Sequence, residues 1–105
     1  MSMYRYTTPT IPCKLEGVDF SRVDYVRIAM DGKNGVCDEP LIREVPAADF
    51  NEEGVALVRL TQEETAAFEE GPIYMQCRIR FLDGNVLPTK KIKTTMEDVI
   101  DKVVI

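Results

Sequence analysis

The sequence predicts an all-β fold, a small antiparallel β-sandwich of six to seven strands with one short capped helix near residues 61–70. Three observations predict it: apolar and polar residues alternate strictly from Ile73 to Phe81, turn residues separate several other short apolar runs, and only one segment carries a helix start signal. A chain of 105 residues is long enough for one core and too short for two. We expect a single domain over residues 4–105, with residues 1–3 as an alternative start or an expression remnant. A small, partly open barrel is the alternative architecture.

The amino-terminal half predicts two strands. Pro9 and Pro12 have no backbone N–H to donate, so residues 10–15 fit an edge strand. A loop over residues 17–21 leads to a second strand over residues 24–30, in which apolar residues recur at every second position. The residues expected to face the core are Ile11, Cys13 and Leu15 in the first strand, and Val26, Ile28 and Met30 in the second.

Turn and strand signals alternate through the middle of the chain. Glycine and asparagine at residues 31–35 predict a turn, after which the chain is expected to return in a short strand at residues 36–37 or at residues 41–45. A polar turn at residues 49–54 precedes a strand at residues 55–60. The inward residues of that strand are expected to be Ala56, Val58 and Leu60.

Helical signals occur at two places. Thr61 and Glu64 have the spacing of a capping box, in which each side chain satisfies the other's backbone N–H at a helix start. That helix should end by Gly71, because Pro72 bars its continuation. The tail over residues 95–105 carries two signals: apolar residues at helical spacing in residues 96–103 predict a short helical turn, whereas residues 103–105 favour a strand. We expect the helical turn followed by an ordered end.

The segment Ile73–Phe81 is the strongest strand signal in the chain, with nine residues in strict alternation. The inward set is Ile73, Met75, Cys77, Ile79 and Phe81, and the outward set is Tyr74, Gln76, Arg78 and Arg80. An Asp-Gly turn at residues 83–84 predicts a hairpin, so a strand over residues 86–95 should pair antiparallel with this segment. Pro88 marks an edge or a bulge in that strand.

The net charge and the lack of a long apolar run argue against nucleic-acid and membrane partners. The formal net charge of −5 argues against nucleic acid, because phosphate binding needs a basic surface. No apolar run approaches the roughly 20 residues that span a bilayer, and the amino terminus lacks a basic segment followed by an apolar core. We therefore expect no nucleic-acid or membrane partner, and a protein made and kept in the cytosol or assembled from there.

The chain contains no histidine, which excludes Ser-His-Asp and Cys-His nucleophilic sites and the usual imidazole metal sites. Its cysteines, Cys13, Cys37 and Cys77, are odd in number and widely spaced, so they are expected to be reduced thiols. Carboxylate pairs such as Glu63-Glu64 are interpreted as solvated or helix-capping groups. We expect no enzymatic activity, no cofactor and no metal site.

Outward strand positions carry residue types that are enriched at binding hot spots. The candidate partner surface consists of Tyr25, Tyr74, Arg78 and Arg80. The alternative is a solvated sheet face with cross-strand side-chain pairs. A basic cluster at residues 90–93 is interpreted as protection of an edge strand, with contact to an acidic partner as the alternative.

Three motifs in order carry a resemblance: YRYTTPT at residues 4–10, LTQEET at residues 60–65, and MQCRIR at residues 75–80 with the Asp-Gly turn after it. They resemble small phage and prophage proteins of gut Firmicutes, and are similar in pattern to the immunoglobulin-like amino-terminal module of phage baseplate upper proteins. The resemblance covers nearly the whole chain and implies an immunoglobulin-like sandwich. Tyr6 stands where glycine is common in that family, and the loop around Lys33 differs. The resemblance offers no active-site residues to carry over.

The resemblance predicts a non-enzymatic virion structural protein, associated with the tail or baseplate, that packs against other phage structural proteins. Its location would be the virion, and the host cytoplasm during assembly. A homo-oligomer formed through edge strands and the apolar carboxy-terminal tail is a further expectation. One alternative is a carbohydrate-binding module for host recognition, which the absence of tryptophan weakens. Another is a prophage regulatory protein that captures a host enzyme.

Overall fold

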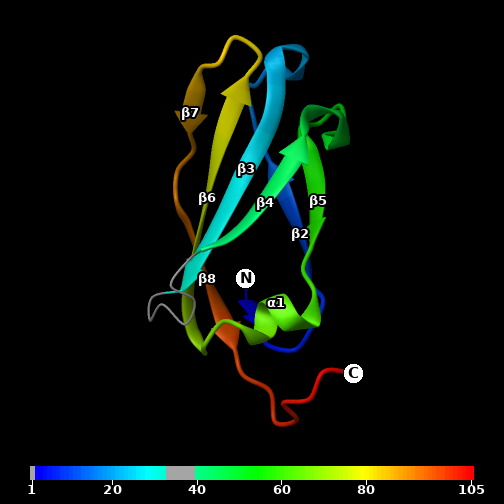
Figure 1. Ribbon diagram of the computed structural model, residues 1–105, viewed down its shortest axis with the longest axis vertical. Coiled ribbons are helices and arrows are strands. Elements are labelled where there is room, and N and C mark those ends of the chain that lie inside the picture. Colours follow the sequence, from blue (N-terminus) through cyan, green and yellow to red (C-terminus); the bar gives the residue numbers. More distant parts are fainter. Residues whose placement is uncertain (1, 33–39) are drawn as a thin grey trace.

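Two unequal sheets form the fold in the computed structural model, which describes residues 2–32 and 40–105. The larger sheet has six strands in the order β1-β8-β6-β3-β4, with β7 also paired to β6, and the smaller sheet pairs β2 with β5 (Figure 1). The strands are β1 (Ser2–Tyr4), β2 (Thr10–Lys14), β3 (Val23–Gly32), β4 (Leu41–Pro46), β5 (Val55–Arg59), β6 (Gly71–Phe81), β7 (Val86–Pro88) and β8 (Ile92–Glu97). The helices are α1 (Gln62–Ala66) and two 3₁₀ turns, η1 (Phe20–Arg22) and η2 (Ala47–Asp49).

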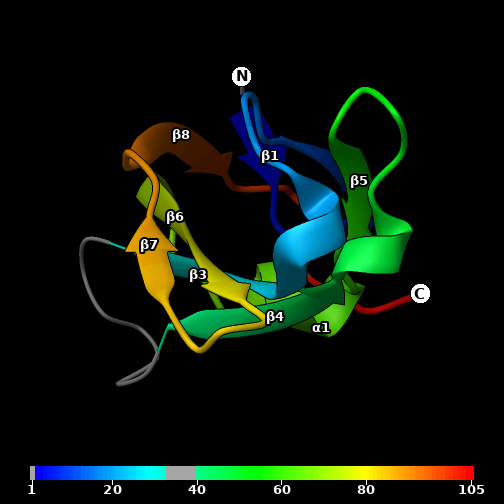
Figure 2. The ribbon, with the colours of Figure 1, turned by 90° about the horizontal axis from the view of Figure 1, so that it is seen from above.

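The predicted β-sandwich is confirmed, with two differences in detail. The described residues form eight strands rather than six or seven. In addition, β1 pairs parallel with β8, so the larger sheet is mixed rather than purely antiparallel. The larger sheet also curls: seen from above, β4, β3, β6 and β8 follow one another around a curve that faces β5 (Figure 2).

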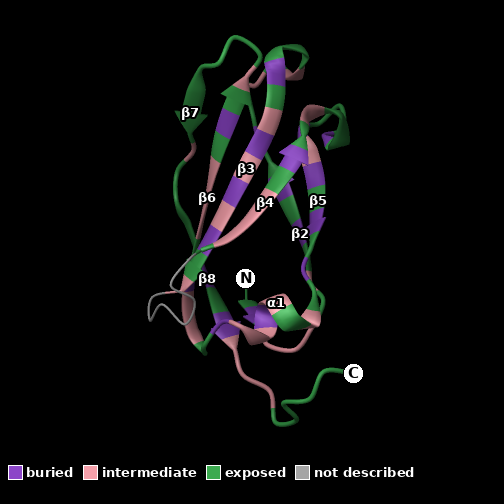
Figure 3. Ribbon diagram, in the orientation of Figure 1, coloured by how far each residue is buried: buried purple, intermediate pink, exposed green. Residues whose placement is uncertain are grey.

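The pair β3–β6 is the centre of the larger sheet, and its register fixes the core. Val26 lies opposite Ile79, and Ile28 lies opposite Cys77. Burial alternates along β3, and the inward residues of β6 are either buried or packed against the core, as period-two patterning requires (Figure 3). The predicted inward and outward faces of both strands are therefore confirmed. The observed strand β6 is longer than predicted, because it begins at Gly71 and includes Pro72.

The smaller sheet faces this core with apolar side chains from both of its strands. The buried positions are Ile11 and Cys13 on β2, and Ala56 and Val58 on β5, as predicted. The Leu15 N–H donates to the Gly54 carbonyl at 2.9 Å, which extends the pairing beyond β2. Gly54 has φ +76°, and a Cβ there would lie 2.5 Å from the Leu15 carbonyl oxygen, so this turn requires glycine.

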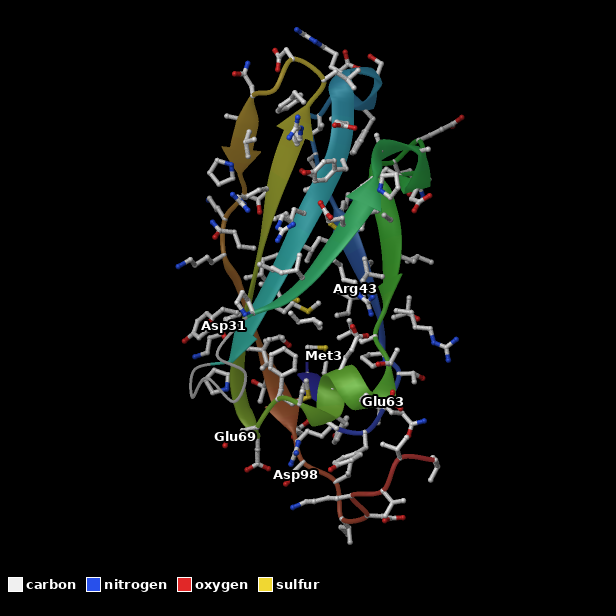
Figure 4. The ribbon with its side chains drawn as sticks, viewed as in Figure 1. Met3, Asp31, Arg43, Glu63, Glu69 and Asp98 are labelled. Atoms are coloured by element: carbon white, nitrogen blue, oxygen red, sulfur yellow. The ribbon has the colours of Figure 1, made fainter. Side chains whose placement is uncertain are left out.

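Helix α1 closes one end of the sandwich through hydrogen bonds. The predicted capping box is present, with Thr61 accepting from the Glu64 N–H and Glu64 accepting from the Thr61 N–H. Thr65 is fully buried, and its hydroxyl both accepts from the Thr7 N–H at 3.1 Å and donates to the Thr7 carbonyl at 2.9 Å. Arg43 reaches from β4 to an ion pair with Glu64 (Figure 4). The helix thereby joins β4 to the segment before β2.

The first residues of the chain belong to this closed end. Met3 in β1 is 2% exposed and belongs to the buried core, so residues 2 and 3 are part of the fold, whereas the predicted domain began at residue 4. Arg5 follows β1 and donates to Asp98 at 3.2 Å and to the Ala66 carbonyl at 2.9 Å. One arginine thus connects the start of the chain, the end of the helix and the segment after β8.

Two segments near the carboxy terminus differ from prediction. The single strand expected over residues 86–95 is divided into β7 and β8, and the chain departs from regular pairing after Pro88, which cannot donate to a ladder. The helical turn predicted in residues 96–103 is wrong. Met96 is fully buried and belongs to β8, where sheet pairing with both β1 and β6 outweighs the helical spacing, and residues 98–105 form neither helix nor strand.

The position of β4 decides between the two return strands that the sequence predicted for the middle of the chain. The return strand lies at residues 41–46 as β4, which confirms the second of the two predicted positions. The other position, residues 36–37, and most of the predicted turn at residues 31–35 lie outside the described residues.

The two faces of β6 give the first testable prediction. Ile79→Asp should cost at least about 3 kcal/mol of unfolding free energy, because it places an unpaired carboxylate among buried apolar side chains. Arg78→Asp is the matched control on the exposed face, and should cost no more than about 1 kcal/mol. Urea unfolding followed by circular dichroism measures both. Equal losses in the two variants would show that the assigned faces are wrong.

Candidate functional site: an apolar groove between the sheets

An apolar groove of about 890 Å³ lies on one side of the sandwich, where the smaller sheet does not cover the larger one. Its floor is the inner face of β3 and β6, and its walls are β2 and the segment from β7 to the start of β8. The floor residues are Ile28, Met30, Met75, Cys77 and Ile79. Charged side chains at the groove include Lys14, Glu16, Asp19 and Lys90. The groove is therefore an apolar channel with charges of both signs around it.

One wall of the groove is a strand edge. Within residues 2–32 and 40–105, β2 pairs only with β5. The hydrogen bond from Leu15 to Gly54 fixes which backbone groups face β5, and antiparallel bonding alternates along the strand. The N–H groups of Thr10 and Lys14 must then point to the opposite edge, and Pro12 between them has no N–H. This confirms the predicted edge strand.

The other wall carries exposed apolar side chains. Leu87 on β7 is 56% exposed and Ile92 on β8 is 61% exposed, and both line the groove. The segment between them is anchored to β6: the Thr89 N–H donates to the Cys77 carbonyl at 2.9 Å, and the Cys77 N–H donates to the Thr89 hydroxyl at 3.1 Å. Lys90 of the predicted basic cluster also lines the groove. This wall is thus held in place while its apolar groups remain open to solvent.

A pair of thiols spans the groove from wall to floor. Cys13 on β2 and Cys77 on β6 are not joined by a disulfide, and their sulfur atoms lie 3.8 Å apart in hydrogen-bonding contact. Cys13 is buried and Cys77 is partly exposed. Cys37, the third cysteine, lies outside the described residues.

The two thiols titrate differently because they share one hydrogen bond. A hydrogen bond from Cys13 lowers the pKa of Cys77 to about 7, against the opposing effect of burial, and Thr89 lowers it further. The same hydrogen bond, together with burial and the neighbouring negative charge, raises the pKa of Cys13. Cys77 is therefore the thiol that ionises first, and Cys13 keeps its proton.

The predicted partner surface lies on the opposite, outer face of the larger sheet. Tyr25 lies directly opposite Arg80 in the β3–β6 register, with the guanidinium carbon 5.9 Å from the ring centre. Arg80 also pairs with Asp24 at 3.4 Å. Arg78 is the next outward residue of β6, whereas Tyr74 lies six residues from Arg80, about 20 Å along the strand. Three of the four predicted residues therefore cluster, and Tyr74 is separate.

The groove and its thiol pair were not predicted as a site. Two signals in the sequence bear on them: Cys13 and Cys77 each occupy an inward position of a predicted strand, and Pro12 predicts an edge strand. Neither signal reveals which strand pairs with which, and the groove depends on that pairing.

The described residues contain neither a cluster of metal-ligating side chains nor a membrane-spanning helix. Over residues 2–32 and 40–105, no three His, Cys, Asp or Glu side chains are grouped so as to hold a metal ion. None of the helices in the same ranges has the length and apolar character needed to cross a membrane.

Of the comparisons with known proteins, the comparison with solved structures gives matches. No protein family description and no curated protein matches the chain. The crystal structure of CopC from Methylosinus trichosporium OB3b is similar, with a TM-score of 0.50 and 14% sequence identity over 95% of this chain and 87% of that one. At this identity the likeness supports the β-sandwich fold and no more.

The thiol pair predicts a pH-dependent reactivity. In a Cys37→Ser variant, alkylation of Cys77 by iodoacetamide should rise with a midpoint near pH 7, because the thiolate is the reactive form and its pKa is about 7. Cys13→Ala removes the hydrogen-bond donor, so the midpoint for Cys77 should move up toward about 8.5, the value of a free thiol. Peptide mass spectrometry measures each site. Identical midpoints with and without Cys13 would contradict the shared hydrogen bond.

Proposed function

We propose that this protein is a non-enzymatic structural component of a phage or prophage tail or baseplate, and that it holds an extended apolar segment of another structural protein in the groove. The observation that carries the packing role is the apolar groove between β2 and β7. The phage assignment is supported by the ordered motifs at residues 4–10, 60–65 and 75–80. The virion would be its location, with the host cytoplasm as the site of assembly.

An extended segment suits this groove better than a compact ligand. The open edge of β2 offers the N–H groups of Thr10 and Lys14 and the intervening carbonyls, which an added strand would pair with. Side chains alternate along a strand, so every second residue of the partner would point into the groove. Pro12 removes one donor, so apolar side-chain contacts would carry more of the affinity than backbone bonds.

The strand β1, at one end of the side of the sandwich that carries the groove, suggests how such a segment would lie. β1 pairs with β8 at residues 95–97, whereas the groove begins at Ile92, the first residue of that strand. The three-residue strand β1 therefore covers only one end of this side. Within residues 2–32 and 40–105, no strand covers the rest of it. A partner strand would continue the covering that β1 begins.

Carbohydrate binding on the outer face is less well supported. Sugar sites commonly stack a sugar ring on an open aromatic face, and the Arg80 guanidinium already lies over the Tyr25 ring. Arg80 is also engaged by Asp24, and Arg27 beside it pairs with Glu44 at 3.6 Å. These contacts favour a sheet face whose charges satisfy one another. Assembly is accordingly assigned to the groove rather than to the outer face.

The groove makes a specific prediction for assembly. The double variant Leu87→Glu/Ile92→Glu places carboxylates on the apolar wall, so its incorporation into particles should fall at least tenfold while its thermal midpoint stays within a few degrees, since both residues are exposed. Leu57→Glu is the matched control, because Leu57 on β5 is 72% exposed and does not line the groove. Quantitative mass spectrometry of purified particles measures incorporation.

Separate outcomes test the two parts of the proposal. If the unmodified chain is absent from particles produced by its source, the phage assignment fails. If the chain is present and the groove variant enters as well as the Leu57 variant does, the groove is not the packing surface. If Arg78→Glu/Arg80→Glu alone is excluded, the outer face is the interface instead. A groove-dependent homo-oligomer in light scattering would identify a second copy as the occupant and overturn the choice of a different protein.

A further inference from the structure

We propose that Cys13 and Cys77 form a reversible disulfide that joins the two sheets of the sandwich. The bond would connect β2, the open wall of the groove, to β6, the strand at its floor. This inference rests on the geometry of the thiol pair and does not depend on the proposed phage function.

The geometry needs only a small movement. The two sulfur atoms are 3.8 Å apart, and a disulfide requires about 2.0 Å. Both residues occupy inward positions on strands of facing sheets, so their side chains already point toward each other. β2 is bonded on one side only among the described strands, and an edge strand shifts more easily than a central one.

A soluble oxidant can reach the pair through the groove. Cys77 is partly exposed, and both cysteines line the groove. Thr89 holds the backbone at Cys77, which keeps this sulfur at the groove floor. The lowered pKa of Cys77 supplies thiolate near neutral pH, and Cys13 keeps the proton that it would lose in the second step.

The reaction balances with a low-molecular-weight disulfide such as oxidised glutathione as the oxidant. The Cys77 thiolate attacks one sulfur of oxidised glutathione, forming a mixed disulfide and releasing one glutathione thiolate. That leaving thiolate or water takes the proton from Cys13, whose thiolate attacks the Cys77 sulfur and releases the second glutathione. The protein loses two electrons and two protons, and one oxidised glutathione becomes two reduced glutathiones.

The bond would stabilise the fold and fix the groove. Its ends are 64 residues apart, so the bond closes a long loop and removes much chain entropy from the unfolded state. A cross-link of that span should raise the thermal midpoint by on the order of 10 °C or more. It would also hold β2 at a fixed distance from β6 along the open side of the sandwich.

The experiment uses the Cys37→Ser protein, which retains only the two facing thiols. Incubation with oxidised glutathione should give a monomer that is lighter by two hydrogens in intact-protein mass spectrometry, with no glutathione attached. Its melting midpoint should rise by on the order of 10 °C and return to the starting value with dithiothreitol. Peptide mapping should find residues 13 and 77 in one cross-linked fragment.

The matched control removes only the resolving thiol. Cys13→Ser in the same background should keep one glutathione on Cys77 and show no comparable rise in melting midpoint. The inference is overturned if the two-thiol protein, folded by circular dichroism, either remains unoxidised or stops at the glutathione adduct. It is also overturned if the rise in melting midpoint is equal in the control, because adduct formation rather than the cross-link would then explain it.

Discussion

A two-stranded sheet covering a six-stranded one is the constraint on which the rest of this structure depends. Sheets bury their apolar faces against another layer, and two strands are too narrow to cover the inner face of β3, β6 and the strands beyond them. The larger sheet compensates partly by curling toward the smaller one (Figure 2). What remains partly uncovered is the groove, whose floor residues belong to the core or pack against it. The open edge of β2 and the access to the thiol pair follow from the same shortage of strands.

The molecule is closed at one end and open along one side. At the closed end, short polar links hold α1, the first residues of the chain and the segment after β8 together, among them the buried Thr65 and the ion pair of Arg43 with Glu64. A buried polar group that is hydrogen-bonded, as the Thr65 hydroxyl is, fixes geometry more than it adds stability. Along the open side, by contrast, Leu87 and Ile92 project from a wall anchored at Cys77. A fixed frame that presents apolar groups is suited to packing against another protein.

The parts of the fold that follow period-two patterning were predictable from sequence. The faces of β2, β3, β5 and β6 and the capping box at Thr61 depend on local spacing, which the order of the residues displays directly. The role of Met3 and the strand at Met96 were not predictable from local spacing, because they depend on the pairing of β8 with β1, at the opposite end of the chain, and with β6. The groove escaped prediction for the same reason: it is a consequence of which strands share a sheet. Cys13 and Cys77 were each assigned correctly to an inward strand position, yet their contact depends on how the two sheets face each other.

The open edge of β2 is tested most directly by amide hydrogen exchange along this strand in the isolated protein, measured by NMR. An open edge predicts fast exchange at Thr10 and Lys14, whose N–H groups point away from β5, and slow exchange at Ile11 and Cys13, whose N–H groups pair with β5. Alternation of this kind would establish that β2 has one unpaired edge beside the groove. Equal protection at all four amides would contradict this, because it would mean that the edge is already covered and the groove is not free to receive a partner.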